Sequence, residues 1–508
     1  MAMMGSRWAM PGWLLLAGSI ALFVGAMLAT MPVQGAVVLL ALGGLLGILV
    51  APWPVLLVGF LVTVAFVVGP LQYAGGVGKA FWLPYLMGVL MGVRVLTDGL
   101  GVRVHKAKAV VHQSSDGPMR AGWMFMGLLG LLATMSSVAH GVGILQAVVA
   151  GKEYLFLWSL PLAFSLGLLN TNHLRRLWQA MSAWLALQAV VVVWQRVVVA
   201  PRRGGDAPWD AVVGLFAGKA NGAGGSGTMA MVSLWAAACV LMAWRAGLAG
   251  GSWALLAAAS VLVACALAEV KLAVLLLPML AAVVLYEPSR HVKSMAMDRP
   301  LRAMGGIGVL CISLALMWAH QQQFSVRGSA DAQSSVRYAQ TVVERNLDTQ
   351  WVADEHGQLT RLGALQYWWT RQSVSDIPGW MIGHGIGAVR RSNLSPGSVV
   401  RGLRIEPGRS SAVILLWETG VLGLVAWVGF SLAWMLSAVR LMAAPSGAHE
   451  SVCLKAAFTI IGVTLLSLPY GADLFEAPHL AVAYLLGVGI VWGVHRQRRQ
   501  GNFAEGKT

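Results

Sequence analysis

Residues 411–439 read SAVILLWETGVLGLVAWVGFSLAWMLSAV, a run in which Glu418 is the only charged side chain. An α-helix needs about 20 apolar residues to cross the hydrocarbon core of a bilayer. The run exceeds that length, and the glycines inside it are typical of membrane helices. It therefore predicts a transmembrane helix.

Apolar runs of this kind recur along nearly the whole chain, and they predict an all-α fold, a polytopic transmembrane helical bundle of about 12–14 spans. An outer-membrane barrel would show short alternating segments instead. The fourteen predicted spans are residues 11–30, 33–51, 53–69, 79–95, 121–139, 154–169, 177–199, 227–244, 252–268, 272–286, 303–319, 411–439, 452–468 and 480–494.

The composition excludes a water-soluble fold. Of the 508 residues, 57% are hydrophobic and 11% are charged, and the mean hydropathy is +0.70. These values are far from those of an ordinary globular chain. The four cysteines lie in apolar runs without metal-binding spacing, which predicts buried free thiols and no metal site.

The net charge of +16 is interpreted as a topology signal and not as a nucleic-acid surface, because many Lys and Arg residues lie in short loops between apolar runs. The basic tail at residues 495–499 predicts a cytoplasmic C-terminus, and an even number of spans then places the N-terminus on the same side. Three regions follow: a bundle of about 11 spans at 1–319, a large periplasmic loop at 320–410, and C-terminal helices with a basic tail at 411–508.

The long loop carries arginine as its only strong cation. Guanidinium groups bind phosphate in a planar, bidentate way, so this composition suits a phosphate or diphosphate ligand. Alternatively, these residues solvate the loop and contact anionic head groups. In residues 390–409, only Glu406 opposes five arginines. The loop arginines are Arg327, Arg337, Arg345, Arg361, Arg371, Arg390, Arg391, Arg401, Arg404 and Arg409.

Three further groups of polar residues interrupt the apolar runs on the predicted periplasmic side. Glu269 and Lys271 lie between two spans, and Lys152 with Glu153 begins another. Each pair is either a structural salt bridge or part of a binding site, since ionisable groups are costly at the membrane boundary. Lys219 lies in a glycine-rich stretch that leads into a helix, whose free N–H groups attract anions.

Three segments resemble the O-antigen ligase and polymerase family of bacterial envelope glycosyltransferases. Residues 214–235 resemble the G-x-F-x-N-x-N segment of that family, with Lys219 near a polar position. Residues 268–273 resemble its Ser-Arg-Gly-Ala-like turn, with Lys271 in place of the arginine. The third segment resembles the family's arginine-led helix, its G-x-G turn and its H-N-x-x-L-x-x-L-x-E-x-G-x-x-G entry into the next helix; it comprises residues 361–369, 378–387 and 409–423.

The resemblance implies an enzyme of the bacterial inner membrane that needs no metal and no cofactor. It would transfer a saccharide from an undecaprenyl-diphosphate carrier to an acceptor at the periplasmic face. Implied partners are this lipid-linked saccharide and membrane lipids, with a chain-length regulator and export proteins as further candidates. Arg409 stands where ligases of the family carry histidine, which favours polymerisation of exopolysaccharide, capsule or O-antigen repeat units.

The implied site combines catalytic and substrate-binding residues. The catalytic candidates are Arg409, His384 as general base and Glu418. Cationic stabilisation of the diphosphate leaving group would be the main catalytic effect. The predicted substrate-binding residues are Lys152, Lys219, Glu269, Lys271, Arg361, Arg390 and Arg404.

Other functions remain open at this point. A ligase or a protein O-oligosaccharyltransferase would use the same scaffold. A flippase or other transporter would place ionisable residues and broken helices near the midplane of the bilayer, whereas here the charges are expected at one end of the helices. A non-catalytic scaffold would tolerate loss of the arginines and lysines.

Overall fold

The computed structural model describes residues 44, 47, 48, 50–110, 117–202, 211–218, 225–285, 308, 311–315, 359–372, 376–390, 397–401, 407–408, 410–444 and 446–505, with backbone alone at 100–110, 271 and 501–505. Within these ranges all regular structure is helical, and nine helices are long and apolar enough to cross a membrane. This is compatible with a multi-pass membrane protein. The chain divides into two compact units, residues 1–58 and 59–508, and the candidate site described below belongs to the second unit.

Each of the eleven predicted spans that fall within the described residues coincides with a helix or an unbroken series of helices. Two of these helices are short, at 17 and 15 residues, namely Gly251–Leu267 and Lys271–Leu285. The predicted spans at 11–30, 33–51 and 303–319 lie wholly or largely outside the described residues, as does most of the predicted loop at 320–410.

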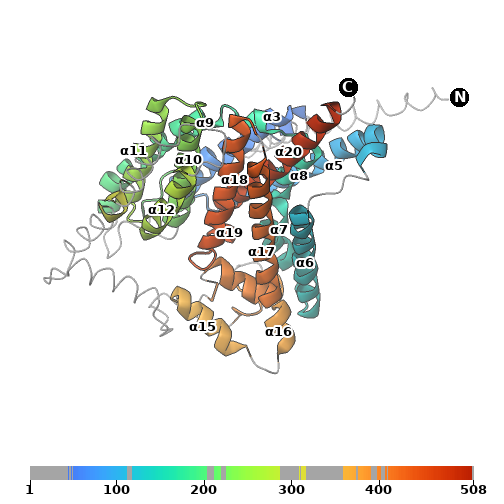
Figure 1. Ribbon diagram of the computed structural model, residues 1–508. Coiled ribbons are helices and arrows are strands. Elements are labelled where there is room, and N and C mark those ends of the chain that lie inside the picture. Colours follow the sequence, from blue (N-terminus) through green and yellow to red (C-terminus); the bar gives the residue numbers. More distant parts are fainter. Residues whose placement is uncertain are drawn as a thin grey trace, which may run out of the picture. The chain divides into compact units, whose positions relative to one another are not determined.

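The main helices are shown in Figure 1. Their bounds are α3 (Trp53–Val62), α4 (Gly69–Tyr73), α5 (Trp82–Val110), α6 (Gly117–Ala139), α7 (Ile144–Leu155), α8 (Ser159–Leu166), α9 (Leu177–Trp194), α10 (Ser226–Arg245), α11 (Gly251–Leu267), α12 (Lys271–Leu285), α15 (Arg361–Arg371), α16 (Ile377–Ile382), α17 (Ser411–Ala443), α18 (Ala448–Ser467), α19 (Asp473–Glu476) and α20 (Pro478–Glu505).

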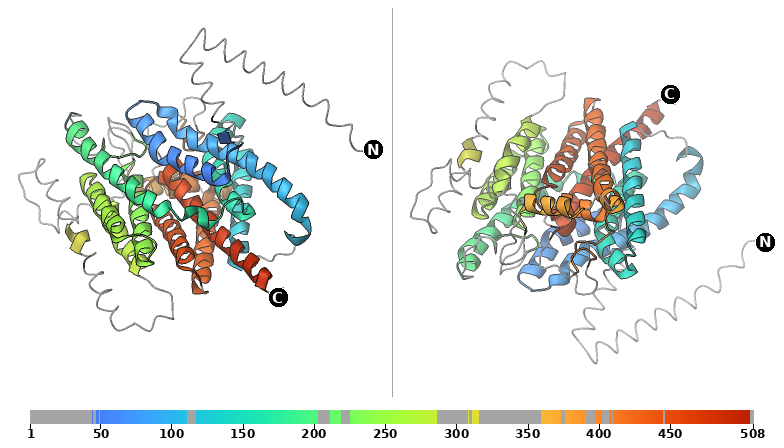
Figure 2. Two further views of the ribbon diagram at one scale, coloured as in Figure 1. Left: turned by 90° about the horizontal axis from the view of Figure 1, so that it is seen from above. Right: turned by 90° about the horizontal axis from the view of Figure 1, so that it is seen from below.

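The most closely packed helices form two groups, one around α17 and α20 and the other around α10. α17 packs along α6 and α18, and α20 packs along α18 and α8, while α10 contacts α9, α11, α12 and α18. Figure 2 shows α10, α11 and α12 gathered together and α17, α18 and α20 gathered beside them. The short helices α15 and α16 pack on α17 at its N-terminal end (Figure 1).

Aromatic side chains fill the space between α6, α17 and α20. Trp434 and Tyr484 are completely buried. The ring of Trp123 on α6 lies 4.4 Å from that of Trp492 on α20 and 6.0 Å from that of Trp434. On the outer faces many large apolar side chains are exposed, such as Met124 on α6. This pattern fits helices whose outer faces contact lipid.

Two of the long helices are interrupted where charged residues occur. The segment from Ile144 to Leu166 passes from α7 through a short 3₁₀ turn into α8. α17 contains a kink at Gly420, whose φ of 70° and ψ of −171° are not helical. The prediction that Lys152 and Glu153 begin a span is wrong, because the helix starts at Ile144 and both residues lie within it. The sequence misplaces this start, because a charged pair is expected at the boundary of a span and not inside it.

Candidate functional site

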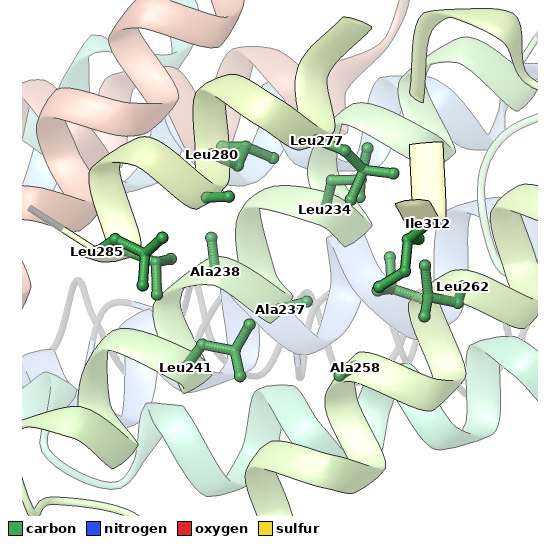
Figure 3. Close-up of a pocket in the computed structure, with 13 residues that line it drawn as sticks. Leu234, Ala237, Ala238, Leu241, Ala258, Leu262, Leu277, Leu280, Leu285 and Ile312 are labelled. Carbon is green, nitrogen blue, oxygen red and sulfur yellow. The ribbon is translucent and has the colours of Figure 1, made fainter. Parts of the chain in front are cut away.

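The apolar cavity between α10, α11 and α12 has no polar side chain to carry chemistry. It has a volume of about 220 Å³, and Figure 3 shows aliphatic side chains such as Leu234, Leu262 and Ile312 pointing into it. The residues that can carry chemistry are therefore the buried ionisable ones elsewhere in the bundle.

The largest buried group of charges joins α7, α17 and the loop after α16. The guanidinium of Arg390 forms an ion pair with Glu153 through Nη1, and its Nε lies 3.4 Å from Glu418 Oε1. The hydroxyl of Tyr154 donates a 2.8 Å hydrogen bond to Glu418 Oε2. Glu418 is completely buried. A loop arginine thus inserts between two membrane helices.

Lys152 extends this group on the α7 side. Its ammonium lies 2.5 Å from Glu153 Oε1 and donates a 2.9 Å hydrogen bond to the carbonyl of Val149. The same ammonium lies 4.8 Å from the ring centroid of Trp82 and 5.5 Å from that of Tyr85. Lys152 is only 3% exposed, so its ammonium has lost most of its contact with water. Aromatic faces attract a desolvated cation, and these rings of α5 therefore help to hold the lysine.

The four ionisable residues Lys152, Glu153, Arg390 and Glu418 contribute two positive and two negative charges. We refer to them as the buried charge cluster. Burial alone lowers the pKa of Arg390, but the neighbouring Glu153 and Glu418 outweigh burial and raise this pKa above its ordinary value. The guanidinium is therefore a permanent cation, and its partners within the cluster compensate its charge. Such a pair is costly to break, because one charge would remain buried alone.

The glycine turn at residues 383–387, GHGIG, docks directly on the kink of α17. Gly383, Gly385 and Gly387 all have positive φ angles, of 78°, 93° and 79°. The amide of His384 donates to the Trp417 carbonyl (2.7 Å), and the amide of Gly385 donates to the Glu418 carbonyl (3.2 Å). The contact is so close that a Cβ on Gly420 would lie 2.2 Å from the Met381 carbonyl oxygen.

The other side of the turn is held by α6 and α7. Ser137 Oγ accepts a 3.1 Å hydrogen bond from the amide of Ile386, and Gln146 Nε2 donates a 3.1 Å hydrogen bond to the Ile386 carbonyl. The turn therefore bridges three helices, and it leads three residues later to Arg390. This geometry explains how an irregular segment places a guanidinium reproducibly between α7 and α17.

His384 lies half-buried in the same turn. Its ring centroid is 5.1 Å from that of His140 and 5.5 Å from that of Trp417. Burial lowers the pKa of His384, the neighbouring His140 lowers it further, and Asp376 opposes both. The imidazole is therefore neutral at pH 7. The Gln372 amide nitrogen lies 3.3 Å from His384 Nε2, so a substrate hydroxyl would have to replace this amide to reach the nitrogen.

A second polar group surrounds the turn between α18 and α20. Arg361, the first residue of α15, donates through Nε to the Tyr470 carbonyl, and its guanidinium carbon lies 3.8 Å from the centroid of the Tyr470 ring. Asp473 accepts a short hydrogen bond from Thr228 at the start of α10. Burial raises the pKa of Asp473, while the Thr228 hydrogen bond and Arg361 lower it.

Phe475 connects the two groups. Its ring lies 4.9 Å from that of Tyr154, the residue that donates to Glu418. The N-terminus of α17 is tied to the same turn, because the amide of Ser411 donates a 2.9 Å hydrogen bond to the Gly471 carbonyl. We define the candidate site as the buried charge cluster, the glycine turn with His384, and the Arg361–Asp473 group.

The structure brings together four of the predicted site residues that it describes: Lys152, His384, Arg390 and Glu418. Arg361 belongs to the neighbouring Arg361–Asp473 group. Glu269 forms its ion pair with Arg196 at 3.0 Å, and its positive φ of 53° marks the tight turn before α12. Lys271 begins α12, but its side chain is not described; Lys219, Arg404 and Arg409 also lie outside the described residues.

Sequence reasoning missed several residues of the site. Glu153 was recognised only as the neighbour of Lys152, although it holds both Lys152 and Arg390. Tyr154 and Thr228 gave no signal, because a tyrosine and a threonine at the ends of apolar runs are common in membrane proteins. Asp473 could have been found from its position in a short polar turn between two spans.

Within the described residues, no three His, Cys, Asp or Glu side chains are grouped so that they could hold a metal ion. No protein-family model matches the chain, and a comparison with curated proteins finds no match.

Proposed function

We propose that this chain is a glycosyltransferase of the bacterial inner membrane that polymerises undecaprenyl-diphosphate-linked oligosaccharide repeat units at the periplasmic face. The ordered motifs of residues 214–423 suggest this class. The observation that supports it best is the docking of the glycine turn on the α17 kink, which brings neutral His384 and the pair of Arg390 and Glu418 to one end of the helices. No metal or cofactor enters the proposal, as the resemblance implies.

In the proposed reaction, an acceptor hydroxyl oxygen forms a bond to the anomeric carbon of the donor sugar. The bond from that carbon to the carrier diphosphate breaks, and its electron pair leaves on the diphosphate. The hydroxyl proton passes to a base, for which neutral His384 is the candidate. Cations near the leaving oxygen stabilise the charge that develops there.

The contacts divide the predicted cations into two roles. Lys152 and Arg390 are compensated by Glu153 and Glu418, so we assign them to positioning: they hold the glycine turn and α17 in register. Diphosphate binding is assigned to arginines of the long loop, with Arg361 as the described candidate and Arg404 and Arg409 as candidates from the sequence.

Complementation of a deletion strain tests this proposal. The variants are wild type, His384→Ala, Arg361→Ala and Arg409→Ala, with Arg440→Ala as a control, since Arg440 is an exposed residue near the opposite end of α17. The readout is the lipid-linked and released glycan, analysed by gel and mass spectrometry at equal membrane levels. We expect the deletion and the His384→Ala, Arg361→Ala and Arg409→Ala variants to accumulate single repeat units on the carrier, and Arg440→Ala to behave as wild type.

Other outcomes would assign the chain differently. Full-length polymer accumulating on the carrier would identify a ligase of glycan to lipid, and unmodified target proteins would identify a protein O-oligosaccharyltransferase. Unchanged glycans in the arginine and histidine variants, despite a phenotype of the deletion, would indicate a non-catalytic scaffold.

A lipid-linked oligosaccharide transporter is the second candidate, and one structural observation favours it. Lys152 and Glu153 lie inside the broken helical segment Ile144–Leu166, and interrupted helices with internal charges are typical of transporters. Lipid-linked units trapped at the cytoplasmic face in the deletion strain would support this function and contradict the glycosyltransferase proposal.

A further inference from the structure

A second irregular segment enters the helix bundle far from the glycine turn. Residues 211–218 form no helix long enough to satisfy their own backbone, yet Ala211 to Phe216 are all buried. In a membrane protein, non-helical backbone is tolerated only where protein or water satisfies its N–H and C=O groups. The partners of this segment therefore decide whether it can stay inside the bundle.

Two glutamines of the preceding helical segment supply these partners. Gln195 Oε1 accepts hydrogen bonds from the amides of Val213 (2.9 Å) and Gly214 (2.6 Å), and Gln195 Nε2 donates to the Gly214 carbonyl (3.0 Å). Gln188 Oε1 accepts a 2.8 Å hydrogen bond from the amide of Leu215. Seven residues make two helical turns, so both side chains point to one face.

The position of Gln188 shows how far residues 211–218 turn back along the preceding helical segment. The candidate span that contains α9 ends at Arg202, fourteen residues beyond Gln188 (202 − 188). At 1.5 Å per residue this corresponds to about 20 Å along the helix. Since the amide of Leu215 donates to Gln188, the chain turns back along this helical segment by roughly the same distance.

Other helices close around the segment. The hydroxyl of Tyr73 donates a 2.7 Å hydrogen bond to the Ala211 carbonyl. A Cβ on Gly69 would lie 1.8 Å from the Leu215 carbonyl oxygen, so these two backbones touch. The ring of Phe216 packs 5.6 Å from that of Trp184. The segment is thus enclosed by α4, α9 and their neighbours.

The segment also fixes the beginning of α10. A Cβ on Gly225 would lie 2.3 Å from the Ala217 carbonyl oxygen and 3.2 Å from Val213 Cγ1. Gly225 is the N-cap of α10, and Thr228, three residues later, donates to Asp473 in the candidate site. A continuous series of contacts therefore runs from Gln195 to Asp473.

We infer that residues 211–217 form a re-entrant loop held inside the membrane bundle by Gln188 and Gln195, and that this clamp positions Thr228 for its contact with Asp473. Gln188 and Gln195 are positioning residues, because they reach the candidate site through the loop and α10. The geometry does not depend on the reaction; only its consequence for glycan transfer rests on the proposed function.

Cysteine labelling tests the loop directly. In a chain whose four native cysteines are replaced, Val213→Cys should be protected from N-ethylmaleimide in native membranes, because Val213 is completely buried. Adding Gln195→Leu should raise its labelling rate at least about tenfold, since buried amides lose their acceptor. Gln179→Leu is the matched control, because Gln179 is an exposed residue of the same helix; it should leave the rate unchanged.

A conservative variant separates hydrogen bonding from packing. Gln195→Glu keeps the acceptor for the amides of Val213 and Gly214 and loses the donor to the Gly214 carbonyl, so its labelling rate should lie between those of wild type and Gln195→Leu. Protection retained in Gln195→Leu but lost in Gln195→Glu would overturn the clamp, because it would show that apolar packing holds the loop. Equal protection in all variants would also overturn it.

Cross-linking tests the positioning of Thr228. The pair Thr228→Cys and Asp473→Cys should form a disulfide on mild oxidation, because the native side chains are hydrogen-bonded to each other. Gln195→Leu should lower the cross-linking yield at least about fivefold, as expected when a buried hydrogen-bonded contact is lost. An unchanged yield would overturn the positioning role. Neither labelling nor cross-linking measures glycan transfer. The re-entrant loop can therefore be confirmed or refuted independently of the proposed glycosyltransferase activity.

Discussion

Arg390 is the side chain on which the candidate site depends most directly, because it forms ion pairs with two buried carboxylates from different helices. A loop residue that carries a permanent charge into the bundle fixes the loop as firmly as a helix contact would. The resemblance predicted a role in substrate binding, and the ion pairs indicate a structural one.

Replacing Arg390 by leucine should destabilise the protein by about 3–5 kcal/mol, because the buried Glu418 would lose its counter-charge and Glu153 would keep only Lys152. The change is measurable as a lower midpoint of thermal unfolding in detergent. The double variant with Glu418→Gln should recover part of the loss. Equal effects of the single and double variants would contradict the pairing.

Replacing Tyr154 by phenylalanine should cost about 1.5–3 kcal/mol of stability, since its hydroxyl donates to the buried Glu418 carboxylate. Thermal unfolding of the purified variant measures this. Tyr484 offers a comparison: it is a buried tyrosine whose hydroxyl is hydrogen-bonded to the neutral Ser431, and Tyr484→Phe should cost less. A larger cost for Tyr484→Phe would argue against the Glu418 contact.

The lowered pKa of His384 leads to a pH prediction. Burial favours the neutral imidazole in the folded protein, so the unfolded chain binds more protons below the ordinary pKa of 6.5. This residue therefore costs no stability above pH 6.5, and its unfavourable contribution grows as the pH falls below that value. Wild type should lose thermal stability more steeply than His384→Gln between pH 6.5 and 5. Parallel curves would contradict the prediction.

At the scale of elements, the candidate site is built mainly from the places where helices are interrupted. The kink of α17, the break between α7 and α8, and the re-entrant segment at residues 211–217 each place irregular backbone inside the bundle. The kink packs against the glycine turn, the re-entrant segment is held by two glutamines, and the break follows directly after the Lys152 and Glu153 of the buried charge cluster. Irregular backbone in a membrane requires such partners, so these elements form a connected scaffold for the site.

The kink of α17 requires glycine at position 420. Its φ and ψ fall in a region that is essentially restricted to glycine, and a Cβ would also meet the Met381 carbonyl. Gly420→Ala should therefore destabilise the protein by more than about 3 kcal/mol, the upper end expected for backbone strain alone. Gly127→Ala is the control, because a Cβ there meets nothing within 4 Å. Similar unfolding midpoints of the two variants would refute the kink.

At the scale of the whole molecule, the described helices separate buried from membrane-facing side chains, and the cysteines report this separation. Cys239, Cys265 and Cys453 are buried, whereas Cys311 is exposed, which corrects the prediction that all four are buried. A hydrophobic run shows that a residue lies in a helix, and only packing decides which face is covered.

In the detergent-solubilised protein, N-ethylmaleimide should therefore react faster with Cys311 than with the other three thiols, and with all four after denaturation in SDS, as followed by mass spectrometry. Cys311→Ser should abolish the fast reaction, because the other thiols are shielded within the bundle. Equally fast native modification of Cys239 or Cys453 would contradict the packing of α10 against α18.

The class of the fold and the positions of most described helices follow from the pattern of apolar residues alone. Apolar runs are local and long, and a membrane span has to satisfy its backbone within one segment, so periodicity and length are sufficient. The exception was the start of the span at Ile144, because the charged pair Lys152 and Glu153 was interpreted as its boundary. Of the four predicted site residues that lie together, Lys152 and Glu418 are conspicuous as costly charges in apolar runs, whereas His384 and Arg390 belong to the loop motif.

How these charges are used depends on contacts between distant segments. Whether Arg390 faces a ligand or a carboxylate depends on Glu153 and Glu418, which lie 237 residues before and 28 residues after it in the chain (390 − 153 and 418 − 390). The clamp formed by Gln188 and Gln195 was equally invisible, because a polar side chain in an apolar helix signals a buried partner without identifying it. Pairing across distant segments is a property of packing, and local sequence does not encode it.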